Sequence, residues 1–333
     1  MATEALKPRT CAETAGTASF WLGDSLSLYG NWEPPACIVS DGPYGVRGYR
    51  GDLDGAEGLA EWYRPHVEAW SRLCLPCCTL WFWNTEQGWA EVHPVLKECG
   101  WQYVSCCIWD KGMGHAAGNV NTQTIGHLPV VTEVCVQYVR RPAVNGVPVK
   151  EWLRSEWKRT GLPLSEANRA CGVANAASRK WLGSDSEWYM PLPDDFAKLA
   201  EYAERHGRAD GKPYFSADGR RPMGAAEWQT LRPKFHCPVG RTNVWNEPHL
   251  SGGERLKDGK KAVHLNQKPL KLMKDIVAMS TDEGDAVWEP FGGLFTASIA
   301  CLSLNRRSFA AEIDPETHSA ASRRIREFFL MEG

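Results

Sequence analysis

Two short motifs near opposite ends of the chain each follow an apolar run, and this arrangement constrains the fold more than any other feature. The first motif, Asp41 to Tyr44, comes just after the run Ala36 to Val39. The second, Glu289 to Gly293, follows Asp285 to Trp288 about 250 residues later. Ligands bind beyond the carboxyl ends of strands in open α/β sheets. The two ends of the chain are therefore predicted to meet in one α/β domain.

The segments around these motifs alternate between predicted strands and helices, which is typical of a mostly parallel sheet covered on both faces. Hydrophobic periodicity predicts strands at 18–22, 36–39, 80–83, 103–109, 130–139, 286–288 and 308–313, and helices at 58–73, 86–98, 264–279 and 296–304. The alternation stops between residues 141 and 235, where two helical stretches and several Pro/Gly turns stand. We therefore predict one α/β domain from residues 1–140 and 236–333, with a helical insert at 141–235.

Composition excludes several classes of protein. No apolar run approaches the roughly 20 residues that span a bilayer, and residues 1–17 lack the pattern of a secretory signal. A cytoplasmic protein without a membrane partner is therefore expected. The 12 cysteines fall mostly in apolar segments, which indicates reduced buried thiols. Cys74 and Cys77 have the C-x-x-C spacing, but no second pair completes a zinc site, so no metal is expected.

Charge is distributed unevenly along the chain, although the formal net charge is only −2. Residues 140–261 contain 22 Lys and Arg against 15 Asp and Glu, whereas the rest contains 16 against 25. Phosphate neutralisation requires a local basic surface and not a basic chain. The middle third is therefore the part expected to face a nucleic acid, with an ordinary solvated surface as the alternative.

The motifs resemble those of the DNA amino-methyltransferases. Residues 41–44 are similar to the catalytic D/S-P-P-Y tetrapeptide, 264–270 to H-P-T-Q-K-P-L, and 289–296 to the cofactor loop D-P-F-x-G-S-G-T-T. With the catalytic motif first and the cofactor loop last, the order resembles the circularly permuted β class. The resemblance implies a Rossmann-like fold, with a mostly parallel seven-stranded sheet, helices on both faces and a helical target-recognition insert.

The activity that this resemblance implies is site-specific methylation of an exocyclic amino group in double-stranded DNA, with S-adenosylmethionine as cofactor and base flipping. The catalytic residues would be Asp41, Gly42, Pro43 and Tyr44. The Asp41 carboxylate and the carbonyl of Gly42 or Pro43 would accept the amino hydrogens, and Tyr44 would stack on the flipped base. Asp41 favours adenine N6, whereas Gly42, in place of the usual proline, and Ser40 leave cytosine N4 open.

The resemblance also implies the residues that bind the cofactor. They are Asp24, His264, Asn266, Gln267, Lys268, Pro269, Glu289, Pro290, Phe291, Gly292, Gly293, Thr296 and Glu312. Glu312 would hold the ribose hydroxyls, and free amides at a helix starting near Thr296 would bind the methionine carboxylate. Glu289 replaces the family's aspartate, and Leu294-Phe295 stands where a small residue and the last glycine are usual.

The insert contains a pattern that resembles a helix-turn-helix, with helices at 164–173 and 174–182 and a glycine at the turn. In that reading Asn175, Ser178 and Arg179 would face the major groove, and Lys158, Arg159 and Lys180 would contact phosphates. Double-stranded DNA is thus the expected partner. The resemblance leaves open a second copy of the chain and a cognate restriction endonuclease.

Three other functions are alternatives to DNA methylation. Gly23 to Leu26 spells the GDSL esterase motif, but Asp314 and His318 have one residue too many between them for the D-x-x-H partner. A catalytically inactive DNA-binding regulator on the same scaffold would fit the altered cofactor loop. A methyltransferase for RNA or protein glutamine would typically have asparagine in place of Asp41.

Overall fold

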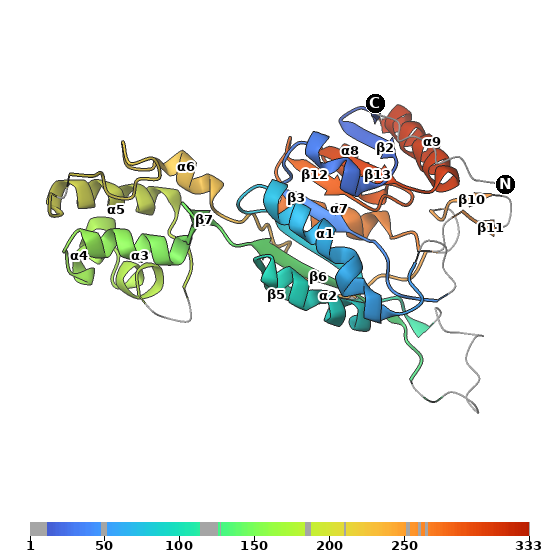
Figure 1. Cartoon of the computed structure of the whole chain (residues 1–333), viewed down its shortest axis with the longest axis horizontal. Helices are drawn as coiled ribbons and strands as arrows, with labels where there is room; N and C mark the ends of the chain where they lie inside the picture. The colour runs from blue at the N-terminus through green and yellow to red at the C-terminus, as the bar shows by residue number, and fades with distance from the viewer. Residues whose placement is uncertain are drawn as a thin grey trace. The chain divides into compact units, whose positions relative to one another are not determined.

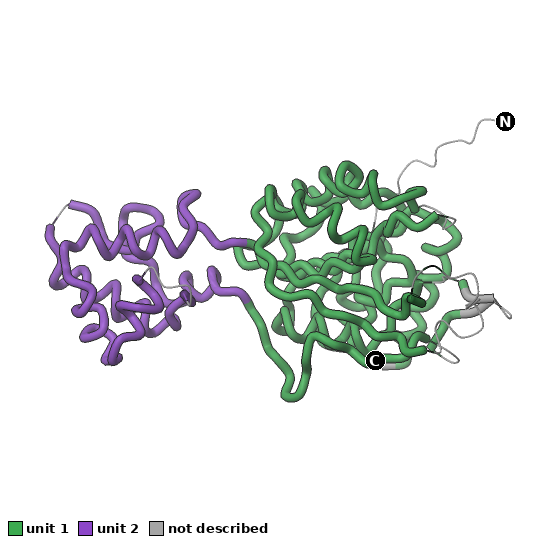
Figure 2. The backbone as a smooth tube through the Cα atoms, turned by 90° about the horizontal axis from the view of Figure 1, so that it is seen from below, with its two compact units in different colours: residues 1–140, 234–333 green, residues 141–233 purple. Residues whose placement is uncertain are grey.

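The computed structural model describes residues 12–47, 52–113, 126, 128–183, 188–209, 211–250, 254–258, 261–263 and 266–332 (Figure 1). The chain divides into two compact units (Figure 2). Unit 1 comprises Met1–Arg140 and Lys234–Gly333, and unit 2 comprises Arg141–Pro233. Within the described ranges, no helix has the length and apolarity required to cross a membrane.

Unit 1 is built on one mixed nine-stranded sheet with the order β1-β2-β13-β12-β3-β4-β6-β5-β9. The strands are β1 Glu13–Ala15, β2 Ala18–Leu22, β3 Cys37–Ser40, β4 Thr79–Asn84, β5 Trp101–Asp110, β6 Thr132–Arg140, β9 Val244–Asn246, β12 Ala286–Glu289 and β13 Arg307–Glu312. Strands β2, β13, β12, β3 and β4 are parallel to one another, and β6 is antiparallel to both β4 and β5. The central strands β3 and β12 are buried throughout, as strands covered on both faces are.

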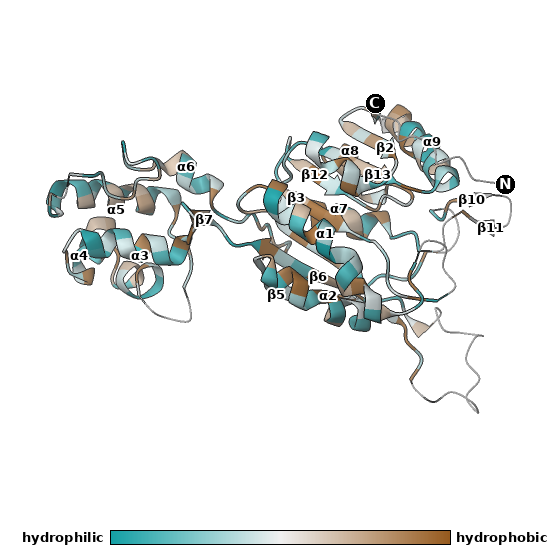
Figure 3. Cartoon of the chain, viewed as in Figure 1, coloured by the Kyte–Doolittle hydropathy of each residue, from teal (hydrophilic) through white to brown (hydrophobic). Residues whose placement is uncertain are grey.

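Helices cover both faces of this sheet. The helices of unit 1 are α1 Leu59–Leu73, α2 Glu86–Glu98, α7 Leu270–Ser280, α8 Thr296–Ser303 and α9 Pro315–Glu332. On β3, Ile38 packs in a core with α1 and α2, whereas its neighbour Val39 packs with α7 and α8. Successive side chains on a strand point to opposite faces, so the two helical layers lie on opposite sides. Figure 3 shows the hydrophobic residues on the strands and on the helix faces directed toward them.

The sheet differs in detail from the seven strands that were predicted. The two additional strands, β1 and β9, are only three residues long and lie at the two edges of the sheet. Segments this short give no clear periodicity. Helix α7 begins at Leu270, not at 264, because Pro269 with extended backbone precedes its first turn. Two smaller two-residue strands, β10 Lys257–Asp258 and β11 Lys261–Ala262, form a separate hairpin.

Unit 2 is helical. Its elements are β7 Ala143–Val144, β8 Val147–Pro148, α3 Val149–Arg159, α4 Leu164–Cys171, the π-helical turn η5 Ala177–Trp181, α5 Pro193–His206 and α6 Ala225–Thr230. Its core contains Phe196 stacked on Trp228, with ring centroids 4.1 Å apart, and Trp152 beside both. The unit ends at Pro233, two residues before the predicted end of the insert.

Candidate active site at the carboxyl ends of the central strands

A pocket opens at the carboxyl ends of β3, β12 and β13, the edge at which parallel strands place ligand sites. It encloses about 510 Å³, including the part open to solvent. Its lining residues come from both ends of the chain: Val39, Asp41, Asn266, Gln267, Lys268, Met273, Glu289, Phe291, Gly292, Gly293, Leu294, Thr296 and Glu312. Ten of them were among the predicted site residues, and Val39, Met273 and Leu294 were not.

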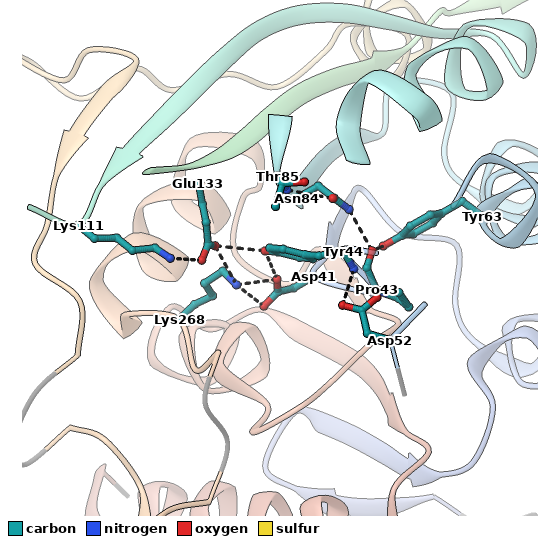
Figure 4. A network of polar contacts seen from close by, with 10 residues as sticks. All are labelled: Asp41, Pro43, Tyr44, Asp52, Tyr63, Asn84, Thr85, Lys111, Glu133 and Lys268. Carbon is teal, nitrogen blue, oxygen red and sulfur yellow. Dashed lines mark hydrogen bonds and ion pairs between the residues drawn. The ribbon is translucent and has the colours of Figure 1, made fainter. Parts of the chain in front are cut away.

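Asp41 follows β3 and is held by a lysine from the segment before α7. The Lys268 ammonium lies 2.7 Å from Oδ1 and 2.9 Å from Oδ2 of Asp41 (Figure 4). Lys268 is 2% exposed. Burial alone would lower the pKa of Lys268, but the charges of Asp41 and Glu133 outweigh burial and raise this pKa above its ordinary value. Lys268 therefore stays charged, and both catalytic-motif oxygens accept hydrogen bonds from it.

Two charged residues that the motifs did not indicate complete this network. Glu133, the second residue of β6, has Oε2 at 3.3 Å from the Lys268 ammonium. Its other oxygen accepts a hydrogen bond from Lys111, which follows β5. Burial would raise the pKa of Glu133, but Lys268 and Lys111 hold it below its usual value. An acidic residue two places into an apolar strand is the signal in the sequence that could have found Glu133.

The Tyr44 side chain is anchored at its hydroxyl. This hydroxyl donates to Oδ1 of Asp41 at 2.7 Å and shares its hydrogen with Oε2 of Glu133 at 3.2 Å. Burial and the two neighbouring carboxylates raise the pKa of Tyr44, so the phenol stays neutral. The ring lies 5.1 Å from the Lys268 ammonium and is 8% exposed. A base that stacks on Tyr44 thus needs a rearrangement of the groups that cover the ring.

The Pro43 carbonyl is fully used within the protein. It accepts hydrogen bonds from the hydroxyl of Tyr63 at 3.1 Å and from Nδ2 of Asn84 at 3.0 Å. A carbonyl oxygen has two lone pairs, so no acceptor capacity remains on Pro43. No group in the described part of the chain donates to the Gly42 carbonyl. Of the two carbonyls expected to accept an amino hydrogen, that of Pro43 is thus occupied, and that of Gly42 has no donor among the described residues.

The absence of a side chain at Gly42 is required by its neighbours. A Cβ atom at this position would lie 2.6 Å from Cδ2 of Phe291 and 2.6 Å from the hydroxyl of Tyr63. Both rings are fixed in an aromatic cluster with Trp62 and His66. The glycine that departs from the usual proline thus matches the packing of the cofactor-like loop against the catalytic motif.

An aspartate outside the motif fixes the backbone that follows Tyr44. The Asp52 carboxylate accepts hydrogen bonds from the amides of Tyr44 at 3.1 Å and Gly45 at 2.7 Å. A Cβ atom at Gly45 would lie 2.6 Å from the Gly55 carbonyl oxygen, and the φ of Gly45 is +71°. Gly45 therefore permits the tight turn that places Tyr44 beside Asp41.

Glu289 ends β12 and closes the start of α8. Its carboxylate accepts hydrogen bonds from the amides of Ala297 at 2.9 Å and Ser298 at 2.8 Å and from the Ser298 hydroxyl at 2.6 Å. The expectation of free amides at this helix start is therefore wrong for Ala297 and Ser298. Burial raises the pKa of Glu289 to about 7, against the opposing effect of these hydrogen bonds.

Phe295 occupies the position of the family's last glycine and retains a backbone that favours glycine. Its φ and ψ are +54° and +41°, in the left-handed region. The side chain is completely buried, with its ring 5.2 Å from that of Phe20. Burial of an aromatic ring offsets a left-handed conformation that costs about 1–2 kcal/mol. The departure from glycine thus alters the packing of the loop and leaves its turn in place.

Glu312 is the last residue of β13 and lines the pocket. Its Oε2 accepts from the Gly293 amide at 2.8 Å, and its Oε1 accepts from the Asp314 amide at 2.7 Å. Burial raises the pKa of Glu312. Asp24 lies one residue beyond Gly23, whose amide donates to the Glu312 carbonyl. Asp24 itself is exposed and caps a short 3-10 turn through the amide of Leu26 at 2.9 Å.

The remaining predicted cofactor residues are placed as follows. Asn266 is exposed at the pocket, and Gln267 is buried, with hydrogen bonds to the Leu256 amide and the Glu254 carbonyl. Pro269 and Pro290 are buried beside the pocket lining without being part of it. His264 lies outside the described residues.

The helix-turn-helix pattern in unit 2 is only partly present. Helix α4 ends at Gly172, whose φ is +67°, but the second helix is a five-residue π-helical turn. Ser178 is engaged within this pair, since Asn168 exchanges two hydrogen bonds with it at 2.9 and 3.0 Å. Asn175 and Arg179 are exposed, and Lys180 is half-buried.

The two predicted phosphate contacts on α3 differ in their surroundings. Lys158 is exposed. Arg159 is half-buried and forms an ion pair with Glu156 at 2.8 Å, hydrogen bonds to the carbonyls of Lys212 and Pro213, and a cation–π contact with Tyr214. Arg159 therefore has a structural role in unit 2, whatever else it contacts.

Comparison with known proteins identifies relatives of this chain. Residues 36–323 match the model of a family described as DNA methylase. The type II methyltransferase M.HinfI of Haemophilus influenzae is 34% identical over 87 residues, which are 26% of this chain and 24% of that protein. The DNA adenine methyltransferase YhdJ of Escherichia coli is 32% identical over 83 residues, 25% of this chain and 27% of that protein. The matched segments thus span about a quarter of these curated relatives.

Solved structures resemble the chain over nearly its whole length. The structure of an M1.HpyAVI–SAM complex covers 92% of this chain and 98% of that chain, with a TM-score of 0.52 and 15% identity. PvuII DNA methyltransferase, which is cytosine-N4-specific, covers 95% of this chain and 93% of that chain, with a TM-score of 0.52 and 13% identity. At these identities the likeness is one of fold. The predicted Rossmann-like methyltransferase fold is confirmed.

Proposed function

Because the chain belongs to the N6/N4 DNA methylase family, whose model matches residues 36–323, we propose that it transfers a methyl group from S-adenosylmethionine to an exocyclic amino group of a base in double-stranded DNA. The observation that carries this proposal is the position of the Asp41 carboxylate and the Gly42 carbonyl. They lie after β3, where the Asp41 side chain lines a pocket shared with the Phe291 to Gly293 loop.

The pocket residues suit S-adenosylmethionine. Glu312 offers a carboxylate at the end of β13, which is the usual partner of ribose hydroxyls in such folds. Gly292 and Gly293 allow close approach of a ligand to the backbone, and Val39 and Met273 supply apolar contacts. Lys268 provides a buried positive charge at the same pocket. The pocket thus offers a carboxylate, an ammonium group and apolar side chains. These groups suit a nucleoside that carries a zwitterionic amino-acid group.

S-adenosylmethionine, when bound, supplies an electrophilic methyl group on a positively charged sulfur. The chain must make the amino nitrogen a better nucleophile, because its lone pair is delocalised into the base. Asp41 and the Gly42 carbonyl would each accept one amino hydrogen and so favour a pyramidal nitrogen. The Asp41 carboxylate would also accept the proton that the amino nitrogen releases on methylation, and the sulfur of the cofactor would keep the electron pair of the broken C–S bond. Positioning therefore carries most of the catalysis.

Adenine N6 is the target base that we favour, since aspartate stands first in the tetrapeptide. Cytosine N4 is the alternative, because either amino group would fit a carboxylate and a carbonyl equally well. Relatives of both kinds are found, with YhdJ named for adenine and the PvuII enzyme for cytosine N4.

Unit 2 is the part that we assign to target recognition. Exposed Asn175 and Arg179 lie at the turn after α4, and exposed Lys158 lies near the end of α3. Side chains of these types contact base edges and phosphates in DNA. Double-stranded DNA is thus the partner that the proposal requires. A second copy of the chain and a cognate restriction endonuclease are further partners that the family resemblance suggests.

The test is nucleoside mass spectrometry of methylation-free genomic DNA after incubation with the purified protein and S-adenosylmethionine. Asp41→Asn is the matched variant, because it keeps the size of the side chain and removes the charge. N6-methyladenine formed only by the unaltered protein would support the proposal, and N4-methylcytosine would assign the alternative base. Absence of both, with cofactor binding retained in calorimetry, would refute DNA methylation and favour an RNA or protein substrate. Loss of cofactor binding as well would favour the inactive DNA-binding scaffold.

A further inference from the structure

We propose that Glu133 and Lys111 are positioning residues for methyl transfer, which set how strongly Lys268 occupies the Asp41 carboxylate. The inference rests on the proposed function. Neither residue lines the pocket, and we assign both a role that acts through Lys268 and not through the ligands. Their influence passes through the buried network drawn in Figure 4.

The contacts place Glu133 between the two lysines. Its side chain is 11% exposed, and its Oε2 lies 3.3 Å from the Lys268 ammonium. The same oxygen also accepts a hydrogen bond from the Tyr44 hydroxyl at 3.2 Å. The opposite oxygen is taken by the Lys111 ammonium, whose side chain is also 11% exposed. The contacts thus link Lys111 to Asp41 through Glu133 and Lys268.

The charges of this cluster balance. Asp41 and Glu133 contribute two negative charges, and Lys111 and Lys268 two positive charges. Among the described residues, the other titratable groups facing the cluster include Tyr44, which is neutral, Tyr63 from α1 and Cys135 from β6, which burial keeps neutral, and Asp52, whose oxygens accept from backbone amides. Removal of one charged residue therefore leaves one uncompensated charge beside the catalytic carboxylate.

The balance matters because an ammonium group has three hydrogens to donate. Lys268 contacts both oxygens of Asp41 and one oxygen of Glu133. If Glu133 loses its charge, two lysines share the single carboxylate of Asp41. The carboxylate is then a weaker acceptor for the amino group of a base. If Lys111 loses its charge, Glu133 attracts Lys268 alone, and the effect on Asp41 has the opposite sign.

The experiment measures the single-turnover rate of methylation of methylation-free genomic DNA with labelled S-adenosylmethionine. Glu133→Gln is expected to slow methylation roughly tenfold, as for loss of one charged hydrogen bond. Lys111→Met should raise the rate, by roughly threefold because Lys111 is more distant from Asp41. The double variant restores neutrality, so its rate should return toward that of the unaltered protein.

Asp285→Asn is the matched control, since it breaks a partly buried ion pair with Lys234 at 2.6 Å outside the site. It should lower thermal stability without changing the methylation rate. Rate changes of opposite sign in the single variants, cancelled in the double variant, would support the inference. Rate changes of the same sign, or unchanged rates with reduced thermal stability, would overturn it and leave a structural role. If the unaltered protein does not methylate DNA, the proposed function itself fails.

Discussion

The Lys268 ammonium lies 2.7 Å from Oδ1 of Asp41, although 227 residues separate the two in the chain. This ion pair joins the catalytic tetrapeptide to the segment before the cofactor loop. The Lys268 side chain is buried, so its charge has to be compensated by the carboxylates that it contacts.

Lys268→Met should lower the free energy of unfolding by about 3 kcal/mol, because Asp41 and Glu133 would remain as close carboxylates without their shared cation. Urea denaturation followed by tryptophan fluorescence measures the change. Lys271→Met is the control, since Lys271 forms an exposed ion pair with Glu247 at 2.6 Å, and exposed pairs contribute little. Equal effects of the two variants would contradict the prediction.

Gly42→Ala should reduce methylation at least roughly tenfold, as a displacement of about 1 Å at a catalytic group can. The added methyl group would lie 2.6 Å from Phe291 and Tyr63 and would push Asp41 out of place. Gly30→Ala is the matched control, because a methyl group there would meet no atom within 4 Å. A single-turnover assay of both variants checks the prediction. Full activity in Gly42→Ala would show that the aromatic cluster can give way.

Phe295→Gly should destabilise the protein by about 2–4 kcal/mol, although it relieves a left-handed backbone. The relief is about 1 kcal/mol, whereas loss of a fully buried phenyl ring costs about 3–5 kcal/mol. Urea denaturation midpoints of the two proteins give the comparison. A variant as stable as the unaltered protein would mean that backbone strain dominates at this position.

Glu289 should make stability fall as pH rises from about 4.5 to about 7. Burial raises the pKa of Glu289 in the folded state to about 7, above its ordinary value of 4.5 in the unfolded state. Its contribution to the free energy of unfolding is therefore fully present below the unfolded-state pKa and is lost as pH rises through the folded-state pKa. The loss is about 3 kcal/mol, from the size of this shift. Glu289→Gln removes the titration, so its urea denaturation midpoint should vary less over this interval. An unchanged pH dependence would contradict the prediction.

Lys158→Ala and Arg159→Ala should have different effects, although the two residues are adjacent on α3. Lys158 is exposed, so its loss should weaken DNA binding and reduce the salt slope by about one. Arg159 holds Glu156 and the carbonyls of Lys212 and Pro213, so its loss should destabilise unit 2. Salt-dependent binding to a DNA duplex and thermal unfolding separate the two results. Reversed effects would refute this assignment.

The sequence predicted the parts of the site that follow strands. Asp41, Glu289 and Glu312 each come at or just after the end of an apolar run, and the parallel sheet brings these ends to one edge. Predicting that these three residues lie together therefore required no knowledge of side-chain contacts. The roles of Asp41 in catalysis and Glu312 in cofactor binding stay predictions.

Glu133 and Lys111 could not be found in this way, because their importance depends on the pairing of β6 with β4 and β5. A single charge in an apolar strand does not indicate which cation it meets. The departures at Gly42 and Phe295 likewise could not be explained from local pattern, because the rings that fill the space are distant in the chain. The composition of the expected second helix favours a helix, so the sequence did not indicate that this helix is only a short π-helical turn.

The strand order also affects how the protein can fold during synthesis. Strands β12 and β13 lie between β2 and β3 in the sheet, yet they are made last. A nascent chain on the ribosome therefore has β2 and β3 but lacks the two strands that connect them. Domains generally fold as units during translation. Unit 1 must wait for its carboxyl-terminal residues, while unit 2, which is continuous, is complete much earlier.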